Sequence, residues 1–296
     1  MNLQKERNSS ADSLHEVRKI TVEESRQYFE KFTFEVLTSK PENRSVKDSF
    51  ESTQNKNTLG TYFKERAWDE DLEGETRVYL VKDPDGKTAA FFSIKCGLVL
   101  KRNIYDKLYE EERQFVDMVV SAKRANNQGA LQSYYEYGES EFEDIDRLFD
   151  IADRRCDTKN ETDEMQDGDK TLKVEECFSA IELKHFCRNE NYSCDKDLRV
   201  PLGFGIFWEV IVKKILVIVD DVGCKYVYIF AADHSEEPEI KRLVYYYKSA
   251  YKFYECDEDD IIIIKPEYDR ECYSLVQEIA KLRENRESVW QEYSDV

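Results

Sequence analysis

Two glycines separated by one residue stand directly before a long apolar run, in the stretch RVPLGFGIFWEVIVKKI from Arg199 to Ile215. The apolar residues of that run recur at helical spacing, so Gly203 and Gly205 are expected at the start of a helix. A glycine has no Cβ and lets the backbone approach a ligand closely, and the amides and dipole of a helix start favour an anion. The pair could therefore hold a phosphate or pyrophosphate, or it could be only a flexible entry to a buried helix.

The residues around the glycine pair exclude the two common nucleotide-binding motifs. The dinucleotide fingerprint needs a third glycine, but Trp208 stands three residues after Gly205. The pair is also not followed by the Gly-Lys-Ser/Thr of a Walker loop. A pyrophosphate held mainly by backbone amides remains possible.

Cysteine and histidine residues form no metal-binding pattern. Eight cysteines are spread along the chain without a CxxC pair, which argues against a zinc module and, in a reducing compartment, for free thiols. His185, Cys187 and Cys194 lie close in sequence, but their separations fit no standard metal spacing. No metal is therefore expected.

The 296 residues carry a formal net charge of -19 at pH 7. Such a field attracts cations and repels polyanions, so the expected partner is a cationic amine, which could be a small molecule, a polyamine or a protein lysine, and neither DNA nor a membrane. The most apolar run is interrupted by Glu209, Lys213 and Lys214, and the first residues lack an apolar core. A cytoplasmic protein without membrane span or signal peptide is predicted, and the oligomeric state is left open.

Periodicity predicts an α/β (α+β) fold, a sheet with helices on its faces. In the central strand, Glu182, Lys184 and Phe186 should face one way, and Leu183 and His185 the other. The predicted elements, in chain order, are a helix in 58–74, a hairpin with strands at 78–81 and 89–94, the central strand in 174–187, the glycine loop and its helix, a strand in 224–233, a helix in 236–253, a strand in 260–269 and an amphipathic helix in 272–293.

We predict a single domain, 18–296, preceded by a flexible arm, 1–17, that is polar and has no period. A large insertion is expected at about 101–172. It begins with a helical stretch from Asn103 to Ala125, continues through a tyrosine-rich piece, and ends in an acidic, nearly apolar-free tail that should be mobile.

The order of strand, glycine loop, helix, strand and tyrosine-bearing helix resembles the GNAT superfamily of acyl-CoA-dependent N-acyltransferases. The resemblance covers roughly residues 57–100 and 175–270. It implies a mixed, mostly antiparallel, twisted sheet with helices on both faces, and acetyl-CoA as the cosubstrate. The segments that carry it are SAIELKHFC, VPLGFG, KYVYIFAAD and LVYYYKSAYKF, together with TYFKERAWDEDLEGETRVYLVKDPDGKTAAFFSIKCG, which is similar to the family's first helix and hairpin.

The resemblance implies a pyrophosphate site at the glycine loop. The family signature, Gln/Arg-x-x-Gly-x-Gly/Ala, falls on Val200 to Gly205, with both glycines matching, Val200 in the first position and Arg199 one residue early. Binding should therefore come from the backbone more than from side-chain charge. Phe186 and Cys187 would pair their backbone with the pantetheine arm beside a strand that splays away. The implied coenzyme-binding residues are Phe186, Cys187, Arg199, Val200, Leu202, Gly203, Phe204, Gly205 and Ile206.

The resemblance also implies two catalytic residues. Amine acylation needs a neutral amine and an acid for the departing thiolate. Glu182 is the implied base, since burial would raise its pKa, although it could instead pair with Lys184 or another basic side chain. Tyr247, six residues before Phe253, is the implied acid, with Tyr246 as its rival.

The predicted function is transfer of acetyl from acetyl-CoA to a primary amine by direct attack. One alternative is a non-catalytic coenzyme-binding or interaction module of the same fold, suggested by Val200 and by Lys252, which stands where the family usually has glycine. The other is a toxin-type acetyltransferase acting on a macromolecule such as charged tRNA. Because RNA contact needs a basic surface, that alternative would require a cationic patch near Lys241, Lys248 and Lys252.

Overall fold

The computed structural model describes residues 20–52, 58–102, 104–157, 174–194, 197–232, 240–256, 261–265 and 272–294. The chain divides into two compact units. Unit 1 consists of Met1–Gly97, Ser179–Glu255 and Lys265–Val296, and unit 2 of Leu98–Phe178 and Cys256–Ile264. The predicted arm and most of the predicted acidic tail lie outside the described residues. The boundaries predicted for the insertion, 101–172, stay a prediction.

The described strands form a mixed, mostly antiparallel sheet in the order β1-β2-β3-β4-β5-β8-β6. β4 and β5 pair in parallel. Antiparallel pairs join β1 to β2, β2 to β3, β3 to β7 and β5 to β8. The strands are β1 Thr33–Val36, β2 Arg77–Lys82, β3 Thr88–Arg102, β4 Val174–Arg188, β5 Tyr226–Ala232, β6 Tyr254–Glu255, β7 Ile261–Ile262 and β8 Cys272–Glu278.

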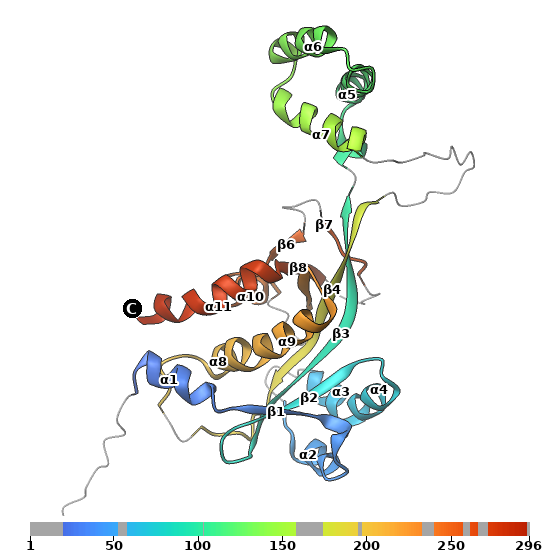
Figure 1. Cartoon of the computed structure of the whole chain (residues 1–296). Coiled ribbons are helices and arrows are strands. Elements are labelled where there is room, and N and C mark those ends of the chain that lie inside the picture. Colours follow the sequence, from blue (N-terminus) through green and yellow to red (C-terminus); the bar gives the residue numbers. More distant parts are fainter. Residues whose placement is uncertain are drawn as a thin grey trace, which may run out of the picture. The chain divides into compact units, whose positions relative to one another are not determined.

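Helices cover both faces of the sheet of unit 1 (Figure 1). Alternate residues of β2 show why: Tyr79 and Val81 join one core, and Val78 and Leu80 join another on the opposite face. We call these the large core and the small core. The helices on the large-core face are α1 Val22–Phe29, α8 Leu202–Ile206, α9 Val212–Val222, α10 Ile240–Tyr251 and α11 Ile279–Ser294; those on the small-core face are α2 Asn43–Ser49, α3 Leu59–Glu65 and α4 Ala67–Glu73.

The predicted hairpin is confirmed as β2 and β3. Its turn is closed by the side chain of Asp83, which accepts hydrogen bonds from the backbone N–H groups of Asp85 (3.0 Å) and Lys87 (2.8 Å). Gly86 has a φ of 82°, a conformation that favours glycine. The turn residues therefore help to fix the register between β2 and β3.

The predicted C-terminal helix at 272–293 is wrong over its first seven residues. Cys272–Glu278 form β8, which pairs antiparallel with β5 along all of its seven positions, and α11 begins only at Ile279. The apolar residues of this segment fit both a helix and a strand, and the hydrogen-bonding edge of β5 decides between them. The strand predicted at 260–269 is present as the short β7, Ile261–Ile262, in unit 2.

The described part of unit 2 contains three α-helices around a core of its own. They are α5 Glu110–Arg124, α6 Gln128–Glu141 and α7 Ile145–Asp157. Phe115, Val116 and Leu148 are almost fully buried in this core. The tyrosine-rich piece, 131–152, falls mostly within α6 and α7, and Tyr134 and Tyr135 pack against this core. None of the described helices, in either unit, is long and apolar enough to cross a membrane.

Candidate active site

β4 and β5 form a fork. In the described part of the sheet they pair over three positions, the last of which joins Glu182 to Tyr228. β4 continues beyond this pair to Arg188, and β5 continues to Ala232. Backbone groups that face an opening of this kind need partners, so the fork suits a ligand that can hydrogen-bond along a strand.

The alternation predicted for β4 is wrong after Leu183. Leu183 and Phe186 both pack against the large core, although they are three residues apart. Lys184 and His185 both approach Tyr62 on the other face. Nζ of Lys184 lies 5.8 Å from the centroid of the Tyr62 ring, and the centroid of the His185 ring lies 3.9 Å from it. A strand of period two cannot do this, so β4 contains a β-bulge at Lys184 and His185. The bulge lies just beyond the last pair with β5.

Glu182 is half-buried at the base of the fork, on the face opposite Leu183. Its Oε2 accepts a hydrogen bond from the Tyr228 hydroxyl at 3.3 Å. Burial raises the pKa of Glu182, and the hydrogen bond from Tyr228 and the charges of Lys95 and Lys184 offset this rise only in part. The ion pair of Lys184 is made with Glu70, at 2.9 Å, and so the alternative pairing of Glu182 with Lys184 is not formed.

The helix after the glycine loop begins at Leu202 and runs without a break through α8, a π-helical segment at Phe207–Ile211 and α9. Gly205 is explained by packing, because a Cβ on it would lie 2.1 Å from Cε2 of Phe29 in α1. Gly203 is different: a Cβ there would meet only the Tyr251 hydroxyl, at 3.4 Å. Of the two glycines, Gly203 is therefore the one whose open surface could admit a ligand.

The first amides of this helix have no acceptor within the helix. The Gly205 N–H donates to the Pro201 carbonyl at 3.2 Å, and helical geometry leaves the N–H groups of Leu202, Gly203 and Phe204 pointing out of the first turn. Some of the side chains predicted to bind the pyrophosphate are buried and others are exposed. Val200, Phe204 and Ile206 are buried in the large core, and Arg199 is exposed while its backbone N–H donates to Ser25 Oγ at 3.2 Å.

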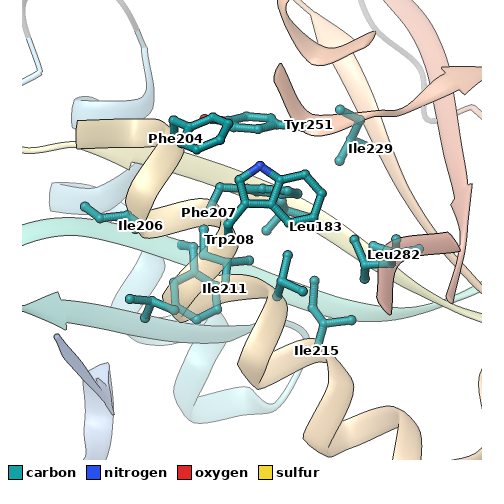
Figure 2. Close-up of a cluster of buried hydrophobic side chains, with 14 of the residues drawn as sticks. Leu183, Phe204, Ile206, Phe207, Trp208, Ile211, Ile215, Ile229, Tyr251 and Leu282 are labelled. Atoms are coloured by element: carbon teal, nitrogen blue, oxygen red, sulfur yellow. The ribbon is translucent and has the colours of Figure 1, made fainter. Parts of the chain in front are cut away.

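Tyr251, which the sequence analysis missed, joins several of the predicted residues. Its ring stacks on Phe207 with centroids 4.0 Å apart and lies 6.5 Å from Phe186 and 5.7 Å from Tyr247. Burial, and then the neighbouring Tyr246, raise the pKa of Tyr251 well above its ordinary value. Figure 2 shows Tyr251 at the edge of the buried cluster around Trp208. The spacing of Ile240, Val244, Tyr247 and Tyr251 along one helix face is the signal that could have identified it.

The two proposed catalytic side chains lie on opposite faces of the sheet. Tyr247 packs against the large core, whereas Glu182 lies on the face opposite Leu183, a large-core residue. Tyr246, the rival of Tyr247, contacts the Tyr251 hydroxyl at 3.5 Å. After α10 the chain turns at Lys252, whose φ of 61° is the left-handed conformation usually taken by glycine. Lys252 thus has the backbone conformation of the glycine that the sequence resemblance implies at this position.

Glu209 fixes the middle of the helix that starts at Leu202. Its side chain is fully buried and meets Arg26 of α1 at 3.2 Å, Lys213 at 3.1 Å and Arg286 of α11 at 3.0 Å. Burial alone would raise the pKa of Glu209, but the hydrogen bonds with Arg286 and Lys213 outweigh it and lower that pKa. Trp290 also donates its indole N–H to this carboxylate, at 2.9 Å. Charge pairing therefore holds the helix between α1 and α11.

The cysteines and the histidine that are close in sequence have separate partners. His185 Nδ1 lies 2.8 Å from Ser93 Oγ, Cys187 contacts Ser52 Oγ at 3.1 Å, and Cys194 contacts the Tyr28 hydroxyl at 3.8 Å. All eight cysteines are free thiols. Within the described ranges there is no group of three or more histidine, cysteine, aspartate or glutamate residues placed to hold a metal ion.

No protein family model matches the chain, and no curated protein matches it. Solved structures align with it at low identity. A mutant of the toxin AtaT aligns over 86% of this chain and 93% of its own, at 8% identity and a TM-score of 0.43. AtaTR bound with acetyl-CoA aligns over 85% of this chain and 96% of its own, at 9% identity and a TM-score of 0.40. AtaT complexed with acetyl-methionyl-tRNA aligns over 85% of this chain and 97% of its own, at 8% identity and a TM-score of 0.40. Similarity this low says nothing about what the present chain does.

The class of fold is established by the chain's own topology. The sheet is mixed and mostly antiparallel, helices cover both faces, and its one described parallel pair opens into a fork before a helix that carries the glycine pair. This is the GNAT-like fold that the sequence predicts.

Proposed function

We propose that this protein is an acyl-CoA-dependent N-acetyltransferase that transfers acetyl from acetyl-CoA to a primary amine by direct attack. The observation that carries the proposal is the half-buried carboxylate of Glu182 at the point where β4 and β5 part. Acetyl-CoA, when bound, supplies an activated thioester. The open fork, the three outward amides at Leu202 to Phe204 and the uncrowded Gly203 suit its extended arm and its pyrophosphate.

In this proposal Glu182 takes the proton of the attacking amine. A carboxylate with a raised pKa is a stronger base than an ordinary glutamate. Tyr247 gives a proton to the departing sulfur, from the opposite face of the sheet.

The test compares Glu182→Gln with wild type on a panel of primary amines. We expect kcat/KM to fall by roughly 10²- to 10⁴-fold, the usual contribution of a general base, while calorimetry shows unchanged acetyl-CoA binding. Glu278→Gln is the matched control, because Glu278 on β8 also accepts a tyrosine hydrogen bond, from Tyr226 at 3.5 Å, but lies away from the fork. Unchanged turnover in Glu182→Gln would remove Glu182 from the mechanism.

Two outcomes would favour the alternatives. Wild-type protein that binds acetyl-CoA but modifies no amine in the panel would indicate a non-catalytic coenzyme-binding module. Growth arrest on expression would indicate a toxin-type enzyme that acts on a macromolecule. The charges near α10 support that second alternative little, since Lys248 is paired with Glu255 at 3.0 Å and Lys252 with Glu292 at 2.8 Å.

A further inference from the structure

The side chain of Tyr228 spans three neighbouring strands. It starts on β5, and a Cβ built on Gly97 of β3 would lie 2.1 Å from its hydroxyl oxygen and 2.5 Å from its Cε1. β4 lies between β3 and β5 in the sheet, so the ring crosses over β4 to reach Gly97. Only 5% of Tyr228 is exposed. The ring therefore fills a fixed space on the sheet, and this space exists only because residue 97 has no side chain.

The hydroxyl of Tyr228 meets Glu182 on the strand that the ring crosses. The distance from the hydroxyl oxygen to Glu182 Oε2 is 3.3 Å, and the two residues form the last pair of β4 with β5 before the fork. A hydrogen bond to one carboxylate oxygen fixes the rotation of the carboxylate and leaves the second oxygen to receive a proton.

We propose that Tyr228 is a positioning residue, which orients Glu182 toward the fork, and that Gly97 is a glycine because Tyr228 must lie there. This inference rests on the proposed function, in which Glu182 accepts the proton of the amine. Tyr228 acts through Glu182 and needs no contact with the substrate. Gly97 acts indirectly, because its lack of a side chain lets the Tyr228 ring take this position.

The charged groups around Glu182 determine the sign of the expected effect. Tyr228 faces it from β5, Lys95 from β3 and Lys184 from β4. Burial raises the pKa of Glu182, and the Tyr228 hydroxyl is the largest of the influences that lower it. Removing the hydroxyl removes a group that stabilises the charged form, so the pKa of Glu182 should rise further.

The experiment is a pH titration of the full-length protein labelled with ¹³C at the glutamate side-chain carboxyl carbons. The signal of Glu182 is identified as the one missing from Glu182→Gln. We expect Tyr228→Phe and Gly97→Ala each to move the titration of Glu182 to higher pH, the first by removing the hydroxyl and the second by displacing it. Tyr226→Phe is the matched control on the same strand, since the Tyr226 hydroxyl is bonded to Glu278, and it should leave the Glu182 titration unchanged.

The same variants give a kinetic readout. Tyr228→Phe should move the acid limb of the kcat/KM profile to higher pH and lower kcat/KM roughly tenfold on that limb, the effect of one hydrogen bond to a charged group, without changing acetyl-CoA affinity. A Tyr228→Phe protein in which Glu182 titrates as in wild type overturns the inference, whatever the activity. A wild type that transfers no acetyl group contradicts the proposed function instead, and the titration still decides whether Tyr228 holds Glu182.

Discussion

The two glycines of the GxG pair have different physical roles at the level of single residues. At Gly205 a side-chain carbon would collide with the ring of Phe29, which packs α1 onto the helix. At Gly203 the same carbon would make an ordinary contact with the Tyr251 hydroxyl. The sequence shows two equivalent glycines, and it could not separate them because Phe29 lies more than 170 residues away along the chain.

Gly205→Ala should therefore destabilise the fold. Forcing a methyl group into a packed site costs about 1–3 kcal/mol of the free energy of unfolding, which urea denaturation would measure. Gly203→Ala is the control in the same turn, and it should be neutral or stabilise the protein by about 0.5–1 kcal/mol because alanine favours a helix. Equal stability of the two variants would contradict the packing argument.

Gly203→Ala should affect the ligand instead of the fold. A methyl group beside the outward amides keeps an anion from approaching them, so we expect acetyl-CoA affinity to fall roughly tenfold, the loss of about one charge-assisted hydrogen bond. Calorimetry on the folded variant is the measurement. Wild-type affinity in Gly203→Ala would move the pyrophosphate site away from this helix start.

At the level of elements, the order of the hairpin, the central strand, the glycine helix and the tyrosine helix was predictable from periodicity. The exceptions are segments whose conformation is determined by contacts with residues distant in the sequence. The β-bulge at Lys184 and His185 places two consecutive side chains beside Tyr62, and nothing in the local sequence signals it. β8 was predicted as a helix because its pairing with β5 is not visible in its own residues.

The helix that starts at Leu202 should depend on the charge of Glu209. Glu209→Gln removes the fully buried carboxylate from Arg26 and Arg286 and leaves them only longer contacts with exposed carboxylates, which should cost about 3 kcal/mol of the free energy of unfolding at pH 7. Glu287→Gln is the control, because Glu287 contacts the same two arginines but 69% of its side chain is exposed, and it should cost less than about 1 kcal/mol.

The pH dependence of this effect has a defined sign. The folded protein lowers the pKa of Glu209, so its contribution is fully present above the unfolded value of about 4.3 and is lost as the pH falls through the folded value. Urea denaturation between pH 7 and pH 3 should show the difference between wild type and Glu209→Gln shrink in the acid range. A difference that stays constant to pH 3 would contradict the pairing.

For the whole molecule, charge is the property that the sequence predicts most directly. A net charge of -19 should draw a cationic acceptor toward the protein at low ionic strength. We expect kcat/KM for a polyamine to fall several-fold between about 0.05 M and 0.5 M salt, whereas kcat/KM for an uncharged aromatic amine should change little. Equal salt dependence for both acceptors would show that the overall field does not select the substrate.

The central claim is that the fork between β4 and β5, with the helix start at Leu202, binds acetyl-CoA. Isothermal titration calorimetry of the full chain with acetyl-CoA tests it most directly. The proposed function predicts saturable binding at one site per chain, weakened in Gly203→Ala and retained in Glu182→Gln. No heat of binding at millimolar acetyl-CoA, from protein shown to be folded, would contradict it.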